Sequence, residues 1–124
     1  MQDPGELMMQ PGLNRALANG VVRCYRRFAG RGPTKAKAVY QGDVVVVVLQ
    51  GILTVGERTL VADGRQAEVR QFREAMHETM GAELAEVIES LTGWHVRAAM
   101  STDDVDRDLA AELFMLERDE TSQD

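Results

Sequence analysis

The chain has 124 residues and a hydrophobic content of 44%, which is enough for one packed core and favours a single domain. Its 20 acidic and 14 basic residues give a formal net charge of −6, which disfavours binding to nucleic acid. The single cysteine, Cys24, excludes an intramolecular disulfide, and no apolar run reaches the roughly 20 residues that span a bilayer, so we expect no direct membrane insertion.

The first eleven residues have a composition typical of a disordered arm, because Pro4, Gly5 and Pro11 interrupt them. Residues Met1 to Asn14 lack the basic and then apolar order of a secretory signal, so we expect the protein to be cytoplasmic. We therefore place one domain over residues 12–118, with a short polar tail over residues 119–124.

An amphipathic helix is predicted from Leu13 to Ala29, where apolar residues recur at spacings of three and four. Gly30, followed by Gly32 and Pro33, is expected to end it. Cys24 lies on the apolar face of this helix. A buried thiol there behaves as a small hydrophobic group with a raised pKa, so we do not expect a nucleophile.

Residues 36–40 and 44–49 predict a β-hairpin, since the short segment Gln41-Gly42-Asp43 separates two strand-like runs. The second run contains five consecutive valines, which are poor helix formers because branching at Cβ restricts their side chains. A run without polar alternation indicates a strand covered on both faces or one in the interior of the sheet. We expect this strand to be central.

A short helix is predicted after Thr54, because Thr54 and Glu57 have the spacing of a capping box. A second helical stripe of apolar residues begins at Arg65 and continues to Gly93. A continuous helix over that stretch is roughly 40 Å long, more than one small domain needs. We expect either a bend near Gly81 or contact with a second copy of the chain.

A second hairpin is predicted from the alternation of residues 94–101 and the run 109–117, with the acidic segment 102–108 as its turn. The expected fold class is α+β, in the order N-terminal helix, β-hairpin, short helix plus long helix, second β-hairpin. The helices are expected to pack on a mostly antiparallel four-stranded sheet.

The best candidate site is the basic loop after the first helix. Seven basic and two acidic residues precede Asp43, whereas seven basic and 18 acidic residues lie from Asp43 onward. Glycine amides and cations in this loop would converge on a small anion. The candidate residues are Arg27, Gly30, Arg31, Gly32, Thr34 and Lys35. The alternative is that the loop only ends the helix, while its cations lie beside the negative helix end or pair with acidic helices.

Two other patterns resemble metal sites but are incomplete. His77-Glu78 begins like a zinc-protease helix, but the second histidine is replaced by Gly81, so a solvated helical histidine is expected. Four aspartates, Asp103, Asp104, Asp106 and Asp108, resemble part of a calcium loop. Leu109 and Met115 stand where that loop needs glycine and glutamate, which favours a solvated acidic turn. We expect no cofactor and no metal, and an enzyme that uses metal at these aspartates is only a third alternative.

Several ordered motifs resemble the MpsC-domain family, formerly a domain of unknown function, over Leu13 to Arg118. They are Gly30-Arg31-Gly32-Pro33-Thr34, Leu49-Gln50-Gly51-Ile52-Leu53-Thr54, Ile88-Glu89-Ser90-Leu91-Thr92-Gly93, Ser101-Thr102-Asp103 and Phe114-Met115-Leu116-Glu117. The chain departs from the family at Val55-Gly56, where a proline and a helix former are expected, which puts the first turn of the short helix in doubt.

The family is named after a sodium-translocating, membrane-potential-generating system linked to inorganic-carbon supply, and the resemblance supplies no catalytic residues. It implies a non-enzymatic cytoplasmic accessory or regulatory domain of a membrane ion-transport system. We expect a homodimer formed through the long helix and a membrane transport subunit as partner. The alternative is a sensor that binds a small anion or a nucleotide at the basic loop from Gly30 to Lys37.

Overall fold

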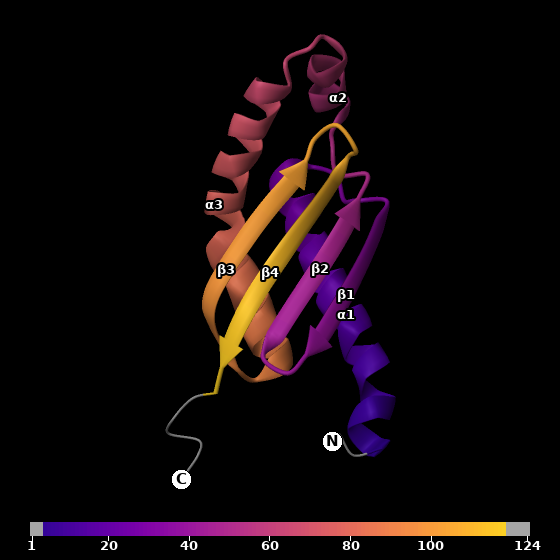
Figure 1. Ribbon diagram of the computed structural model, residues 1–124, viewed down its shortest axis with the longest axis vertical. Coiled ribbons are helices and arrows are strands. Elements are labelled where there is room, and N and C mark those ends of the chain that lie inside the picture. The colour runs from indigo at the N-terminus through magenta and orange to yellow at the C-terminus, as the bar shows by residue number, and fades with distance from the viewer. Residues whose placement is uncertain (1–3, 119–124) are drawn as a thin grey trace.

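The computed structural model of the chain describes the backbone of residues 4–118 and the side chains of residues 12–118. Its elements are α1 (Pro4–Ala29), β1 (Lys35–Gln41), β2 (Val44–Gln50), α2 (Val55–Ala62), α3 (Gln66–Thr92), β3 (His95–Asp104) and β4 (Leu109–Glu117). All neighbouring strands are antiparallel, in the order β1-β2-β4-β3. Helices α1 and α3 pack against each other behind the sheet, and α2 lies beyond one end of it (Figure 1). The predicted α+β class is confirmed.

Helix α1 begins at Pro4, nine residues before the start predicted from the apolar periodicity. Residues 4–11, which we expected to be a disordered arm, therefore continue the helix. Proline is tolerated at the first helical position, where its missing N–H costs no hydrogen bond, and the following leucine and methionines are good helix formers. The predicted polar tail, 119–124, lies outside the described residues.

Strand β2 lies between β1 and β4, so its predicted central place is confirmed. Its valines nevertheless alternate in burial: Val45 and Val47 are fully buried, whereas Val48 is 42% exposed. The strand is interior because it has a hydrogen-bonded neighbour on each side, and only one of its faces is covered by helices.

The capping box predicted for α2 is present. The Glu57 amide donates to Thr54 Oγ1 at 3.1 Å, and the Thr54 amide donates to Glu57 Oε1 at 2.9 Å. Helix α3 runs unbroken through Gly81 and ends at Gly93, whose φ of 78° is the left-handed conformation of a helix C-cap. Its buried residues extend from Val69 to Ile88, so the domain's own core uses most of the helix length.

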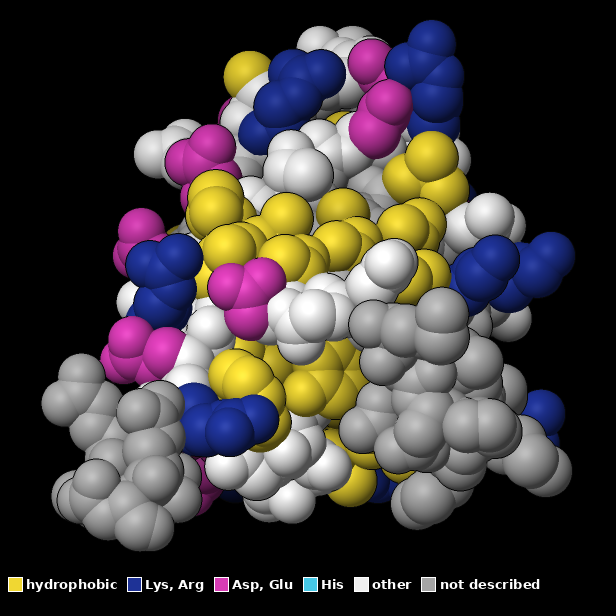
Figure 2. Space-filling view, turned by 60° about the horizontal axis from the view of Figure 1, so that its bottom comes forward, with side chains coloured by type: hydrophobic (Ala, Val, Ile, Leu, Met, Phe, Trp, Pro, Cys, Tyr) yellow, Lys and Arg dark blue, Asp and Glu magenta, His cyan; other side chains and the backbone are white. Residues whose placement is uncertain are grey.

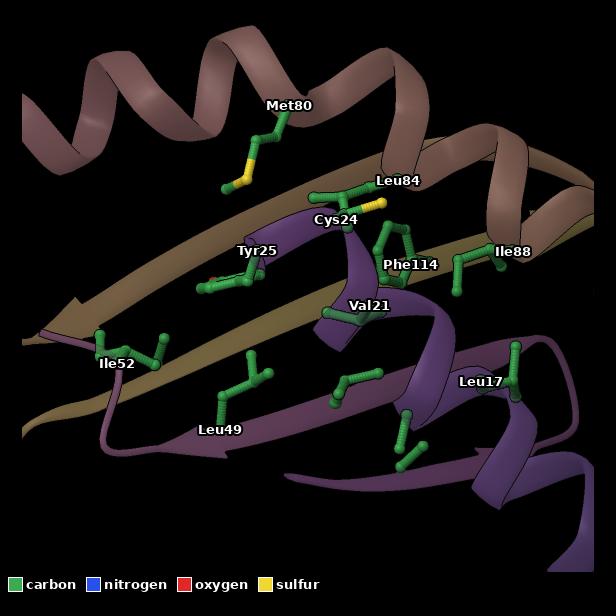
Figure 3. Packing of buried hydrophobic residues seen from close by; sticks show 14 of the residues in the cluster. Leu17, Val21, Cys24, Tyr25, Leu49, Ile52, Met80, Leu84, Ile88 and Phe114 are labelled. Carbon is green, nitrogen blue, oxygen red and sulfur yellow. The ribbon is translucent and has the colours of Figure 1, made fainter. Parts of the chain in front are cut away.

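The core lies between the two long helices and the inner face of the sheet. Figure 3 shows side chains from α1, α3 and the sheet meeting there, among them Leu17, Val21, Tyr25, Leu49, Met80, Leu84, Ile88 and Phe114. Strand β3 continues to Asp104, so the turn is shorter than the predicted segment 102–108. Asp103, within this strand, pairs with Arg73 and His77 of α3 and does not turn toward water.

Candidate functional site

A network of five buried charged side chains joins the helices to the sheet. Its members are Glu57 on α2, Arg73 and His77 on α3, Asp103 on β3 and Glu112 on β4. Each side chain is at most 9% exposed. We call this set the charge network.

Local structure explains how these residues meet. Arg73 and His77 are four residues apart, so they lie one above the other on the same face of α3. In the β3–β4 ladder Asp103 pairs with Ala110, and Ser101 pairs with Glu112. Side chains alternate along a strand, so all of these strand residues point to the face that α3 covers.

Arg73 links α2 to β3. Its Nη1 lies 3.2 Å from Glu57 Oε2, and its Nε lies 3.3 Å from Asp103 Oδ1. Burial opposes the charged guanidinium, but the charges of Asp103 and Glu57 outweigh this cost and raise the pKa of Arg73. The cation is therefore fixed between the two carboxylates.

His77 lies between two carboxylates. Its Nε2 is 2.8 Å from Asp103 Oδ2, and its Nδ1 is 3.0 Å from Glu112 Oε2. Burial disfavours the imidazolium, but the hydrogen bond to Asp103, the close contact with Glu112 and the charges of both carboxylates raise the pKa of His77 to about 9. The expectation of a solvated helical histidine is wrong, because carboxylates from the neighbouring strands β3 and β4 enclose the ring.

Glu112 is the most buried member, with a side chain that is 2% exposed. The Tyr25 hydroxyl on α1 donates to its Oε2 at 2.6 Å, and the Ser101 hydroxyl donates to its Oε1. Burial, followed by the charge of Glu112, raises the pKa of the Tyr25 hydroxyl, which therefore stays protonated and acts as a donor. Glu112 thus ties α1, α3 and β3 together.

A pocket of about 540 Å³ lies against this network, between α3 and the β3–β4 half of the sheet. Its lining is Arg70, Glu74, His77, Glu78, Gly81, Leu84, Ala99, Ser101, Thr102, Asp103, Glu112 and Phe114. Four carboxylates and two basic groups border it, so the pocket is acidic on balance. Within the described part of the chain, no group of three or more metal-ligating side chains is placed to hold a metal ion.

The polar side chains of the predicted anion loop contact three different parts of the protein. Arg27 Nη1 donates to Glu83 Oε1 at 2.7 Å, and Arg31 Nη1 donates to the Leu53 carbonyl at 3.2 Å. The Thr34 hydroxyl donates to the Gln50 carbonyl at 3.2 Å.

The remaining loop residues have backbone roles or are exposed. Gly30 has a φ of 81° just after the last turn of α1, Gly32 packs against the Arg26 side chain, and Lys35 begins β1. These contacts stabilise the loop. Anion binding there stays a prediction from the sequence.

The four clustered aspartates also separate. Asp103 belongs to the charge network, Asp104 accepts from the Arg107 amide and guanidinium, and Asp106 lies 3.6 Å from Arg70. Asp108, in the left-handed conformation with a φ of 57°, accepts from the backbone amides after β2. The expectation of a solvated acidic turn is wrong for Asp103 and Asp108, since both bind protein groups.

Sequence reasoning missed Glu57, Arg73, Glu112 and Tyr25 as site residues. One signal for Glu112 was present, because it occupies an inward position in a strand whose other inward residues are Ala110, Phe114 and Leu116. A carboxylate in that row requires a partner in the core. Arg73 gives a similar signal on α3, because a cation on the buried face of a helix also requires a partner in the core.

The fold and the site define a two-layer α+β domain in which a buried charge network fixes three helices to an antiparallel sheet. No helix in the described part of the chain has the length and apolar character needed to cross a membrane. The chain belongs to the MpsC family: the family model described as "Na+-translocating membrane potential-generating system (MpsC)" matches residues 10–118. No curated protein and no solved structure matches the chain.

Proposed function

We propose that this protein is a non-enzymatic accessory domain of a Na⁺-translocating, membrane-potential-generating system, and that it regulates a membrane subunit from the cytoplasmic side. The observation that carries the proposal is the family match, which extends over nearly the whole chain. The finer role, regulation by binding, is supported by the chemistry of the charge network and of the pocket beside it.

The charge network favours binding over catalysis. Each of its three carboxylates contacts Arg73, His77, Tyr25 or Ser101, so the network's charges are used to hold its own elements together. Buried charges of this kind are stable only when they keep their partners. A carboxylate that left the network to act on a substrate would leave a buried cation uncompensated.

The pocket has the charge that a membrane subunit would require. Cytoplasmic loops of membrane proteins are enriched in lysine and arginine. The pocket carries Glu74 and Glu78 on the exposed side of α3, and the whole chain has a formal net charge of −6. We propose that a basic segment of the membrane subunit binds at this acidic pocket, where it would contact α3 beside His77.

The proposal is tested in the native host by deletion, complementation and recovery of partners. A potentiometric dye should report a reduced membrane potential in the deletion strain and a normal one after complementation with the wild type. A tagged wild-type protein should recover a polytopic membrane subunit from detergent-solubilised membranes. An unchanged membrane potential on deletion, with only soluble proteins recovered, would refute the proposal.

Matched variants of α3 locate the binding site. Glu78→Lys reverses one exposed charge at the pocket and should lose both the membrane subunit and the complementation. Glu86→Lys changes an exposed glutamate of the same helix outside the pocket lining and should retain both. Equal loss in the two variants would assign the effect to net charge and reject the pocket as the contact.

A further inference from the structure

The outer face of the sheet, opposite α1 and α3, carries a continuous apolar surface. Figure 2 shows a band of hydrophobic side chains across the molecule. Strand register places the following residues on this face: Val39, Val44, Val46, Val48, Ala98, Met100, Ala111, Leu113 and Met115. We call this set the outer apolar face. Met100 is 57% exposed and Val39 is 47% exposed, and a contiguous apolar surface of this kind marks an interaction site.

Opposite charges flank the outer apolar face at its two edge strands. One outward row across the sheet consists of Lys35, Gln50, Leu109 and Asp104. The next row consists of Lys37, Val48, Ala111 and Thr102. The β1 edge is therefore basic in both rows. The β3 edge carries Asp104 in the first row, whose carboxylate already accepts from Arg107 at 3.0 Å and whose side chain is 40% exposed. Neither lysine has an ion-pair partner among the described residues.

We propose that a second copy of this chain covers the outer apolar face, so that two sheets pack face to face around a twofold axis parallel to the strands. That axis places β1 of one copy over β3 of the other. Lys35 of each copy then lies opposite Asp104 of the other, and Lys37 lies opposite Thr102. An axis perpendicular to the strands would place β1 over β1 and lose this charge match.

The area of the face agrees with a dimer of moderate affinity. Four strands about 4.8 Å apart are roughly 20 Å wide, and the seven residues of β2 extend roughly 24 Å. The face therefore covers roughly 500 Å² on each copy, or about 1,000 Å² for the pair, which is the lower limit for specific interfaces. The sequence suggested the long helix as the dimer contact. Among the described residues, three exposed large hydrophobic side chains, Val39, Val48 and Met100, lie on this face of the sheet, whereas one, Phe72, lies on α3.

Sedimentation equilibrium of the full chain over about 1 to 200 µM tests the interface, because small interfaces dissociate in this range. The wild type should change from one chain to two as its concentration rises. Val48→Lys and Met100→Lys each place a charge inside the interface and should raise the dimer dissociation constant about tenfold or more. Both positions are exposed, so the fold, checked by circular dichroism, should be unaffected.

Phe72→Lys is the matched control, since Phe72 is 54% exposed but lies on α3. This variant should dimerise like the wild type. A wild type that stays a single chain across the range would overturn the proposal. Dimerisation that survives both sheet variants, or that only Phe72→Lys removes, would also overturn it and would place the contact elsewhere.

Two changes of charge test the direction of the axis. Lys35→Glu should weaken the dimer by about tenfold, because it puts like charges opposite each other. Thr102→Glu should strengthen it, and adding Lys37→Ala should cancel that gain. Lys37 and Thr102 of one copy are three strand spacings apart, about 14 Å, which exceeds the screening length in physiological salt. If Lys37→Ala removes the increase in dimer affinity caused by Thr102→Glu, the two residues interact between copies. If the increase remains without Lys37, this axis is rejected.

Discussion

His77 Nε2 on α3 lies 2.8 Å from Asp103 Oδ2 on β3, and this contact joins the middle of the longest helix to an edge strand. Burial would raise the pKa of Asp103, but the His77 hydrogen bond and charge, with the charge of Arg73, lower it. Each member of the pair thus favours the charged form of the other. The His77–Asp103 contact between α3 and β3 is therefore strongest when the imidazole is protonated.

The stability of the protein should fall as the pH rises from about 6.5 to about 9. The pKa of His77 is about 9 in the folded protein and about 6.5 in the unfolded chain, where the ring has its ordinary value, so folding favours proton binding. The His77 contribution is complete below pH 6.5 and is lost as the pH rises through 9. It should amount to about 3 kcal/mol of the free energy of unfolding. Urea unfolding at about pH 6, 7, 8 and 9 measures this decrease.

Histidine variants assign the pH dependence to its residue. His77→Gln should be less stable than the wild type at about pH 6 and should lose most of the decrease between about pH 6.5 and 9. His95→Gln changes the chain's other histidine, which is 58% exposed, and should keep the decrease. A wild-type stability that is constant across this range would show that the imidazole is not held as a cation.

Arg73→Ala should destabilise the protein by about 3 to 5 kcal/mol, because it leaves Glu57 and Asp103 buried without their cation. Arg70 offers a control three residues earlier on the same helix. Its side chain is half exposed and lies 3.6 Å from Asp106, so Arg70→Ala should cost less than about 1 kcal/mol. Chemical denaturation of both variants at pH 7 provides the comparison, and similar losses would contradict a buried, paired Arg73.

The parts of the fold that depend on local sequence signals could be predicted. The capping box between Thr54 and Glu57, the apolar stripe that ends at Gly93 and the valines of β2 each express a preference of neighbouring residues. The start of α1 was missed because the two prolines of its first residues suggested a break, although Pro4 occupies a position that tolerates it.

The charge network could not be predicted in the same way, because its contacts join residues that are far apart in the sequence. Tyr25 and Glu112 are separated by 87 positions, and Glu57 and Arg73 belong to different helices. Sequence patterns show that Glu112 and Arg73 fall on buried faces, but the partner of each depends on how the helices lie on the sheet. The distance between Lys35 and Asp104 also depends on strand order, which the sequence leaves open.

Cys24 should react slowly in the folded protein. Burial, followed by a hydrogen bond to Glu83, raises the pKa of the thiol to about 11. At pH 8 this lowers the reactive thiolate fraction about 100-fold relative to an ordinary thiol, before any protection by burial is counted. Ellman's reagent should therefore label the native protein far more slowly than the urea-unfolded protein. Cys24 is the single cysteine, so Cys24→Ser provides the blank, and a native rate within tenfold of the unfolded rate would contradict the buried site.

Asp108 should be a stability determinant of the loop that leads from β2 to α2. Its Oδ1 accepts from the amides of Ile52 at 2.7 Å and Leu53 at 2.8 Å, and its backbone is left-handed with a φ of 57°. Asp108→Ala removes the one oxygen that accepts both hydrogen bonds, and it leaves a residue with a Cβ but no local side-chain hydrogen bond in the left-handed conformation. We expect a loss of about 2 to 4 kcal/mol.

Asp108→Asn separates the two contributions. Asparagine tolerates the left-handed conformation and keeps a carbonyl oxygen in the same place, so this variant should lose only about 1 kcal/mol. Asp108→Gly keeps the backbone conformation without the acceptor and should fall between the two. Urea unfolding of the three variants measures their order of stability. We expect asparagine to be the most stable and alanine the least, because two backbone amides donate to one side-chain oxygen. A glycine variant as stable as the asparagine variant would show that backbone conformation alone, and not the hydrogen bonds, holds the loop.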